Sequence, residues 1–378
     1  MNHTRRALLR ASAGAAAIAF AGTSRAQGRQ QKIVLGQSVP LTGAADQIGT
    51  AYSAGAKLFF DAFNGARPAP GWTFEVRQMD DGYDAARAGA NAKKLLADGA
   101  DLLFGFVGTA SSDAAAKAAG EQGKLLFAPF AAADRLRPPA VNHVFHVRPS
   151  LSDEASKMVR HCATLGQTRL AVVAVDDAMG QGGLAAVQQA LVEQKMAPLV
   201  AQATVPVNSD KVDAAVAAVL KAQPQAVILV SLFKTTAAVI RQLRRGGYAG
   251  TLMAFSVVGI DPLFAELGKD IGGVVLTQVV PSPRSPNTPI VKEYLAAIDR
   301  TDQIASYESL EGYIAAKTLA EAVKRSGKPG DPAALAKALA AMTDYDVGGF
   351  RINLRAGMHD SVRAVDLVTI TPDGKVLR

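Results

Sequence analysis

The sequence predicts an α/β protein made of two lobes, each with a parallel sheet flanked by helices. The chain has 378 residues, more than one typical domain core holds and well suited to two lobes. Short apolar runs alternate with stretches of helical spacing, which is the pattern of repeated βα units. At His143 this alternation starts afresh, and two successive α/β blocks of similar size indicate two lobes.

The first block, up to residue 128, contains four predicted strands joined by helices. In its first helix, Ala51, Ala54, Leu58 and Phe59 fall on one side, as helical spacing requires. The predicted strands are 33–36, 72–79, 101–107 and 125–128, and the predicted helices are 50–64, 83–98 and 110–122.

The second block runs from His143 to residue 255, and a less regular region follows it. We expect the blocks after residue 280 to return to the first lobe, because that lobe otherwise lacks helices on one side. Residues 143–148 are expected to be extended, and the predicted strands are 169–175, 199–205, 225–231, 251–255, 274–280, 351–354 and 362–370. The predicted helices are 150–165, 179–194, 211–222, 235–245, 290–299, 306–326 and 332–342.

The first 26 residues are predicted to be an export signal and not part of the fold. A basic start (residues 4–10) precedes an apolar run (residues 11–21), and Ser24-Arg25-Ala26 offers the small residues that a signal peptidase recognises. We therefore expect cleavage after Ala26 and a soluble protein in the periplasm. The paired arginines leave two export routes open, a twin-arginine signal and a general-secretion signal.

The composition argues against several classes of function. The formal net charge of +8 falls to about +4 without the four arginines of the signal, which is too small and too dispersed to indicate nucleic-acid binding. Cys162 is the only cysteine, so an internal disulfide is excluded, and we interpret it as a buried, inert thiol.

Motifs of catalysis are absent from the sequence. There is no G-x-S-x-G elbow, no G-x-x-x-x-G-K-[ST] loop and no G-x-G-x-x-G after the first strand. His143 and His146 lie three apart on an extended run, so they point to opposite faces and make no metal set. The acid pairs Asp80-Asp81 and Asp176-Asp177 are better explained by caps and loop hydrogen bonds. We predict no catalytic residue, no metal and no cofactor.

Ligands of open parallel sheets gather beyond the carboxyl ends of the strands. The second of the loops at these ends opens a helix with small and hydroxyl residues around Thr109, so free backbone N–H groups there could seat a carboxylate or phosphate. Simple capping of the helix by Ser or Thr is the alternative. The loops concerned are 37–49, 108–113 and 128–133 in the first lobe and 176–180, 232–234 and 255–257 in the second.

Several short, distinct segments of the mature chain follow one another in a specific order and spacing, although each is weak alone. They are Ile33-Val34-Leu35-Gly36, Leu41-Thr42-Gly43, Gly49, Gly55-Ala56 to Asn64, Asp80-Asp81, Lys94-Leu95 to Gly105, Ser111, Leu126 to Pro129, Met179-Gly180 to Gly183, Arg241-Gln242-Leu243-Arg244 and Asp346-Val347-Gly348-Gly349-Phe350. Together they resemble the branched-chain amino-acid-binding (Leu/Ile/Val-type) family of periplasmic solute-binding proteins of ABC importers, over essentially the whole mature chain.

The resemblance implies the type I periplasmic-binding-protein fold, in which two Rossmann-like lobes joined by three hinge crossovers close on one small-molecule ligand. It places residues 27–148 and 280–364 in lobe 1 and residues 149–279 and 365–378 in lobe 2, with the ligand cleft between them. It also implies an ABC permease of the inner membrane as partner and no enzyme activity. We expect a monomer.

The family's carboxylate-binding positions correspond here to Thr109 and Ala110 and to the segment 130–132. Ala132 stands where the family has Thr, Ser256 where it has an acidic residue, and Met179 where it has an aromatic residue. The predicted ligand-binding residues are Gln47, Ile48, Thr109, Ala110, Phe130, Ala131, Ala132, Met179, Phe233 and Ser256.

These departures bear on the ligand, because an α-ammonium group buried without an anionic partner would be costly. Either another carboxylate, such as Glu308 or Asp176, supplies the partner, or the ligand is not an α-amino acid; Lys234 could add positive charge. We favour a small aromatic or aliphatic carboxylate over leucine. A ligand sensor of the same fold is the alternative function, and an exported α/β hydrolase is a weaker one.

Overall fold

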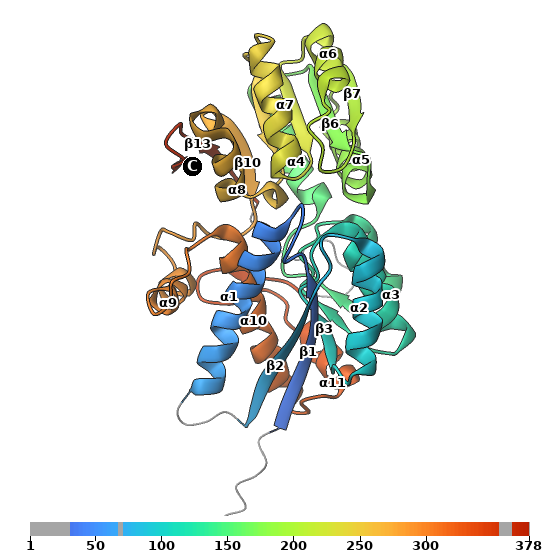
Figure 1. Cartoon of the computed structure of the whole chain (residues 1–378), viewed down its shortest axis with the longest axis vertical. Helices are drawn as coiled ribbons and strands as arrows, with labels where there is room; N and C mark the ends of the chain where they lie inside the picture. The colour runs from blue at the N-terminus through green and yellow to red at the C-terminus, as the bar shows by residue number, and fades with distance from the viewer. Residues whose placement is uncertain (1–30, 67–70, 355–364, 378) are drawn as a thin grey trace, which may run out of the picture.

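Two mostly parallel sheets, each flanked by helices, lie one above the other along the long axis of the molecule (Figure 1). The computed structural model describes residues 31–66, 71–354 and 365–377. The predicted export signal lies outside these residues and stays a prediction. Within the described part of the chain, no helix combines the length and the apolar character needed to cross a membrane.

The first sheet has the strand order β2-β1-β3-β4-β5, and each neighbouring pair is parallel. Its elements are β1 (Gln31–Val39), α1 (Asp46–Gly65), β2 (Trp72–Asp80), α2 (Ala85–Ala97), β3 (Leu102–Phe104), α3 (Thr109–Glu121), β4 (Leu126–Phe127) and β5 (Val144–Phe145). Alternate strand residues serve two separate cores. Val34 and Leu103 pack with α2 and α3, whereas Ile33 and Leu35 belong to the core that contains α1.

Three later helices, α9 (Pro289–Ile298), α10 (Tyr307–Ser326) and α11 (Pro332–Ala340), lie beside this first sheet (Figure 1). α10 packs directly on α1, and glycines permit the contact. A Cβ atom at Gly55 would collide with the carbonyl oxygen of Ser309, and one at Gly312 would collide with that of Tyr52. The two helices therefore touch backbone to backbone. We call the first sheet with the helices that pack on it lobe 1.

The second sheet has the order β14-β13-β10-β9-β8-β6-β7; its pairs from β10 to β7 are parallel, and β13 and β14 add antiparallel pairs at one edge. We call this sheet with its helices lobe 2. Its elements are α4 (Leu151–Thr164), β6 (Leu170–Val175), α5 (Ala178–Glu193), β7 (Ala201–Val205), α6 (Asp213–Ala222), β8 (Ala226–Val230), α7 (Phe233–Arg245), β9 (Thr251–Ala254), α8 (Ile260–Leu267), β10 (Val274–Gln278), β13 (Asp366–Ile370) and β14 (Val376–Leu377). A small antiparallel pair, β11 (Tyr345–Asp346) and β12 (Arg351–Ile352), stands apart.

The chain passes between the lobes after β5, after β10 and before β13. The structure confirms the predicted fold class, two sheets of mostly parallel strands flanked by helices, while the exact lobe boundaries stay predictions. The predicted strand 101–107 ends at Phe104, because Gly105 takes a φ of +65° that breaks the extended backbone. Cys162 is a buried free thiol, as predicted.

Substituting Gly55 tests the contact between α1 and α10. Gly55→Ala should lower the free energy of unfolding by ~1–3 kcal/mol, since the added methyl group overpacks a backbone contact. Gly65→Ala is the matched control on the same helix, because no atom lies within 4 Å of its Cβ position. Urea unfolding of the two variants measures the difference, and equal midpoints would contradict the close helix contact.

Candidate functional site

A cavity lies between the two lobes, beyond the carboxyl ends of strands from both sheets, and its empty space, part of it open to solvent, is about 350 Å³. Lobe 1 lines it with Ala45, Ile48, Tyr83, Val107, Gly108, Thr109, Phe130, Ala131 and Ala132, and lobe 2 lines it with Leu151, Met179, Leu232 and Val257. Among the lining residues that the structure describes, only Tyr83 and Thr109 bring polar side chains. The lining therefore suits a small molecule with an apolar body and few polar groups.

The N-terminus of α3 opens onto this cavity. Gly108 is its N-cap residue with a φ of 95°, and no side chain caps the helix, so the alternative of capping by Ser or Thr is wrong. A Cβ atom at Gly108 would lie 2.7 Å from Cε2 of Tyr83, so glycine lets the Tyr83 ring lie against the helix start. Thr109 is 4% exposed. The free N–H groups of the first turn and the helix dipole favour a negatively charged group here.

Backbone hydrogen bonds fix the cavity loops of lobe 1 relative to one another. The N–H of Gly108 donates to the carbonyl of Phe130 at 3.1 Å, and the N–H of Phe130 donates to that of Phe106 at 2.7 Å. The carbonyl of Ala132 accepts from the N–H of Leu151 at 2.7 Å, which connects this loop to the start of α4. The start of α3 and the segment after β4 are thereby held around one space.

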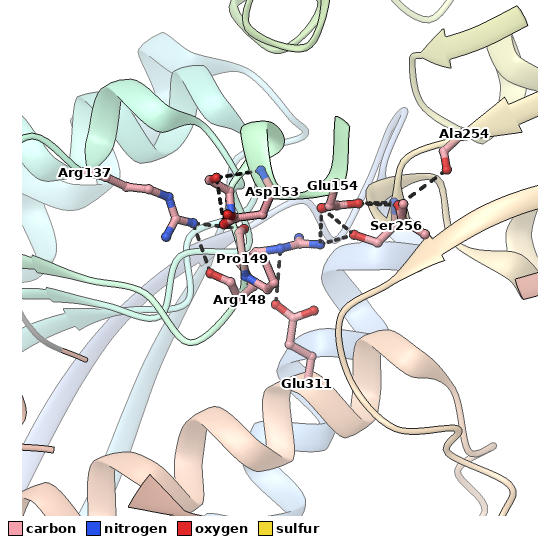
Figure 2. A network of polar contacts seen from close by, with 10 residues as sticks. Arg137, Arg148, Pro149, Asp153, Glu154, Ala254, Ser256 and Glu311 are labelled. Carbon is pink, nitrogen blue, oxygen red and sulfur yellow. Dashed lines mark hydrogen bonds and ion pairs between the residues drawn. The ribbon is translucent and has the colours of Figure 1, made fainter. Parts of the chain in front are cut away.

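Arg148 is the centre of a buried polar network beside the cavity (Figure 2). Its guanidinium carbon lies 4.2 Å from the centre of the ring of Phe130, a lining residue. Nη2 of Arg148 donates to Oγ of Ser256 at 2.5 Å. The guanidinium also pairs with Glu154 at 4.0 Å and with Glu311 at 3.7 Å. Because the Arg148 side chain is only 1% exposed, protein groups and not water compensate its charge.

This network joins segments that are far apart in the sequence. Arg148 follows β5 at the first passage between the lobes, and Glu311 comes from α10 of lobe 1. Glu154 on α4 of lobe 2 accepts from the N–H of Ser256 at 2.8 Å and from the Thr277 hydroxyl on β10. Arg137 donates to the carbonyl of Arg148 at 3.1 Å. The network therefore links the two lobes in the arrangement that the structure shows (Figure 2).

Burial dominates the pKa shifts of Glu308 and Glu311 on α10. It raises the pKa of Glu311 to about 7, although the neighbouring charge of Arg148 opposes the shift. Burial also raises the pKa of Glu308 above its usual value. The charged form of each side chain is therefore disfavoured in the folded protein.

The structure brings six of the predicted site residues to the cavity lining: Ile48, Thr109, Phe130, Ala131, Ala132 and Met179. Four others lie elsewhere. Gln47 lines a separate surface hollow, and the Ala110 side chain is exposed. Phe233 is fully buried in the core, and Ser256 belongs to the Arg148 network. Their roles in ligand binding stay predictions.

Sequence reasoning missed Tyr83 and the network role of Arg148. Tyr83 follows the carboxyl end of β2, so the strand-end rule that selected the other loops could have selected it as well. Arg148 is different, because its partners Glu154, Ser256 and Glu311 become neighbours only through the fold. Among the described residues, no group of three His, Cys, Asp or Glu side chains could hold a metal ion.

Comparison with known proteins decides the family. Residues 32–375 match the family model described as periplasmic binding protein. This chain belongs to the periplasmic binding protein family. The resemblance found in the sequence is thereby confirmed.

Named relatives agree with this family. The binding protein is 23% identical over 334 residues to the Leu/Ile/Val-binding protein homolog 3 of Brucella melitensis, and the match covers 88% of each chain. It is 28% identical to a possible leucine/isoleucine/valine-binding protein from Rhodopirellula baltica, with a TM-score of 0.86 over 92% of this chain and 97% of that one. A Streptococcus pneumoniae branched-chain amino acid transporter substrate binding protein, solved with isoleucine, shares the fold at 18% identity, with a TM-score of 0.79 over 92% and 98% of the two chains.

Replacing Glu311 tests the buried network through the pH dependence of the free energy of unfolding. Because burial raises the folded-state pKa of Glu311 to about 7, the folded protein keeps a proton that the unfolded chain releases near pH ~4.3. Stability is therefore lost as pH rises between these two values. We expect the wild-type free energy of unfolding to fall relative to Glu311→Gln over this range, by at most ~3 kcal/mol.

Urea unfolding at pH 5 and pH 7.5 measures this change. Glu193→Gln, at an exposed position, is the control and should leave the pH dependence as it is in the wild type. A constant difference between the wild type and Glu311→Gln would show that burial does not control this carboxyl group.

Proposed function

We propose that this binding protein captures a small carboxylate or amino-acid-like solute between its lobes and delivers it to an ABC importer. The cavity carries the proposal, because strand ends of both lobes line it. This is the position at which open α/β sheets bind ligands. The Brucella relative is named a Leu/Ile/Val-binding protein homolog, and a Pseudomonas aeruginosa relative is named as binding leucine, isoleucine, valine, threonine and alanine. Both names support this class of solute.

Capture requires the lobes to move apart and close again. Lining residues of both lobes are buried; Thr109 of lobe 1 is 4% exposed and Met179 of lobe 2 is 5% exposed. A solute from the surrounding water can reach them only when the lobes separate, and closure then removes it from water. The three passages of the chain between the lobes are the places where the backbone would bend.

Binding in this cavity needs no covalent chemistry. A carboxylate would lie at the start of α3, where it accepts hydrogen bonds from free N–H groups and from the Thr109 hydroxyl. The apolar part of the solute would pack against Phe130, Met179 and Val257. We therefore propose a transport function without catalysis.

Export of the chain can be checked by mass spectrometry. We propose that signal peptidase cuts after Ala26, so the protein from a periplasmic fraction should begin at Gln27. Changing Arg5 and Arg6 together to Lys should stop export only if the twin-arginine route is used. A periplasmic protein that still begins at Met1 would contradict the proposed cleavage.

A thermal-shift screen against amino acids, aliphatic and aromatic monocarboxylates and dicarboxylates tests the proposed function. At least one solute should raise the melting temperature, since a ligand stabilises the state that binds it. Titration calorimetry of the best solute should give one site per chain. If no solute stabilises the protein, the proposal fails.

Thr109→Val should weaken binding of that solute about 10- to 100-fold, because a hydrogen bond to a charged group contributes ~1.5–3 kcal/mol. Thr318→Val is the matched control, since Thr318 is also buried but its hydroxyl donates to the Ile314 carbonyl within α10. Equal losses of affinity in the two variants would show that the Thr109 hydroxyl makes no specific contact with the solute.

A further inference from the structure

No carboxylate lies in the part of the cavity lining that the structure describes. The polar side chains there are the Thr109 hydroxyl and the Tyr83 phenol. Among the described residues, none forms a hydrogen bond with the Thr109 hydroxyl, and Thr109 is 4% exposed. A buried hydroxyl and free helix N–H groups can all donate to an anion, whereas an ammonium group, itself a donor, needs acceptors.

Ser256 does not line the cavity, because its polar groups are engaged by the Arg148 network. Ser256 is 6% exposed, and its hydroxyl accepts from Arg148 at 2.5 Å and donates to Oε1 of Glu154 at 3.0 Å. Its N–H donates to Oε2 of Glu154 at 2.8 Å. The next residue, Val257, lines the cavity instead and is apolar.

The buried carboxylates beside the site are engaged by other protein groups. Glu154 accepts from Ser256 and from Thr277, and it pairs with Arg148. Glu311 pairs with the same guanidinium at 3.7 Å. Figure 2 shows both carboxylates directed at Arg148. Neither side chain belongs to the cavity lining.

The two other acids that could serve an ammonium group also lie outside the lining. Asp176 is an exposed residue just after β6. Glu308 is buried in the first turn of α10, where its Oε1 lies 2.7 Å from the Cβ position of Gly259. Lys234, the added positive charge considered above, is exposed and does not line the cavity.

We propose that this site takes a monocarboxylate with an aliphatic or aromatic body and no α-ammonium group. The inference rests on the proposed function and names its solute class. The carboxylate is held at the start of α3 by Thr109, and the body lies against Phe130 and Val257. An ammonium group would be buried without a counter-charge, because Arg148 engages Glu154, Glu311 and Ser256.

Matched pairs of ligands test this inference on the wild-type mature protein. Calorimetry compares leucine with 4-methylpentanoate and phenylalanine with 3-phenylpropanoate; each pair differs only by the amino group. In every pair that binds, the acid should bind at least about tenfold more tightly than the amino acid. If an amino acid binds as tightly as its partner or more tightly, the inference falls and the proposed function stands. If none of the four ligands binds and other carboxylates also fail, both fall.

Two substitutions at Val257 provide a second test. Val257→Asp places a carboxylate on the cavity wall, and Val257→Asn places an uncharged group of the same shape there. The Asp variant should shift the affinity ratio at least tenfold toward the amino acid of a pair, and the Asn variant should not. Thermal unfolding establishes that both variants fold. A folded Asp variant with the wild-type ratio would overturn the inference.

Discussion

A guanidinium group that is 1% exposed must find its counter-charges inside the protein, and Arg148 finds them on both lobes. Glu311 belongs to α10 of lobe 1, while Glu154 and Ser256 belong to lobe 2. Separating the lobes at this point would part the guanidinium from Glu154 and Ser256, so the network favours the arrangement in which the lobes are together. The network therefore restricts how the lobes meet, and it lies beside the cavity that the same junction forms.

The geometry of the cavity follows from how parallel strands are connected. The parallel strands end at the edge where their sheet faces the other lobe, so the loops after β1, β2, β3 and β4 meet those after β6, β8 and β9. Glycine at position 108 leaves the first turn of α3 uncapped and open to this space. The backbone contact of α1 with α10 holds the segment that carries Ile48. Packing of lobe 1 and the shape of the site thus depend on the same helices.

The fold was largely predictable because its signals are local. Buried strands such as β6 and β8 are continuous apolar runs, and helices such as α1 have clear periodicity. The site was partly predictable, since the strand-end rule selected Thr109, Phe130 and Met179 correctly as lining residues. The rule names a loop but not the side chains that point inward.

Side-chain direction could not be predicted, because it depends on partners that are distant in the sequence. The Ser256 side chain bonds with Arg148, which is 108 residues away in the sequence, and the next residue, Val257, lines the cavity. Phe233 packs into the core while its neighbour Leu232 lines the cavity. α8 was not predicted, because it is only eight residues long, begins after Gly259 and contains Pro262, so its helical pattern is short and carries residues typical of loops.

A crystal structure of the protein with the solute that stabilises it most tests the central claim most directly. The account predicts the solute between the lobes, its carboxylate within hydrogen-bonding distance of the Thr109 hydroxyl and its body in contact with Val257 of lobe 2. A solute bound to one lobe alone, or outside the cavity, would contradict it.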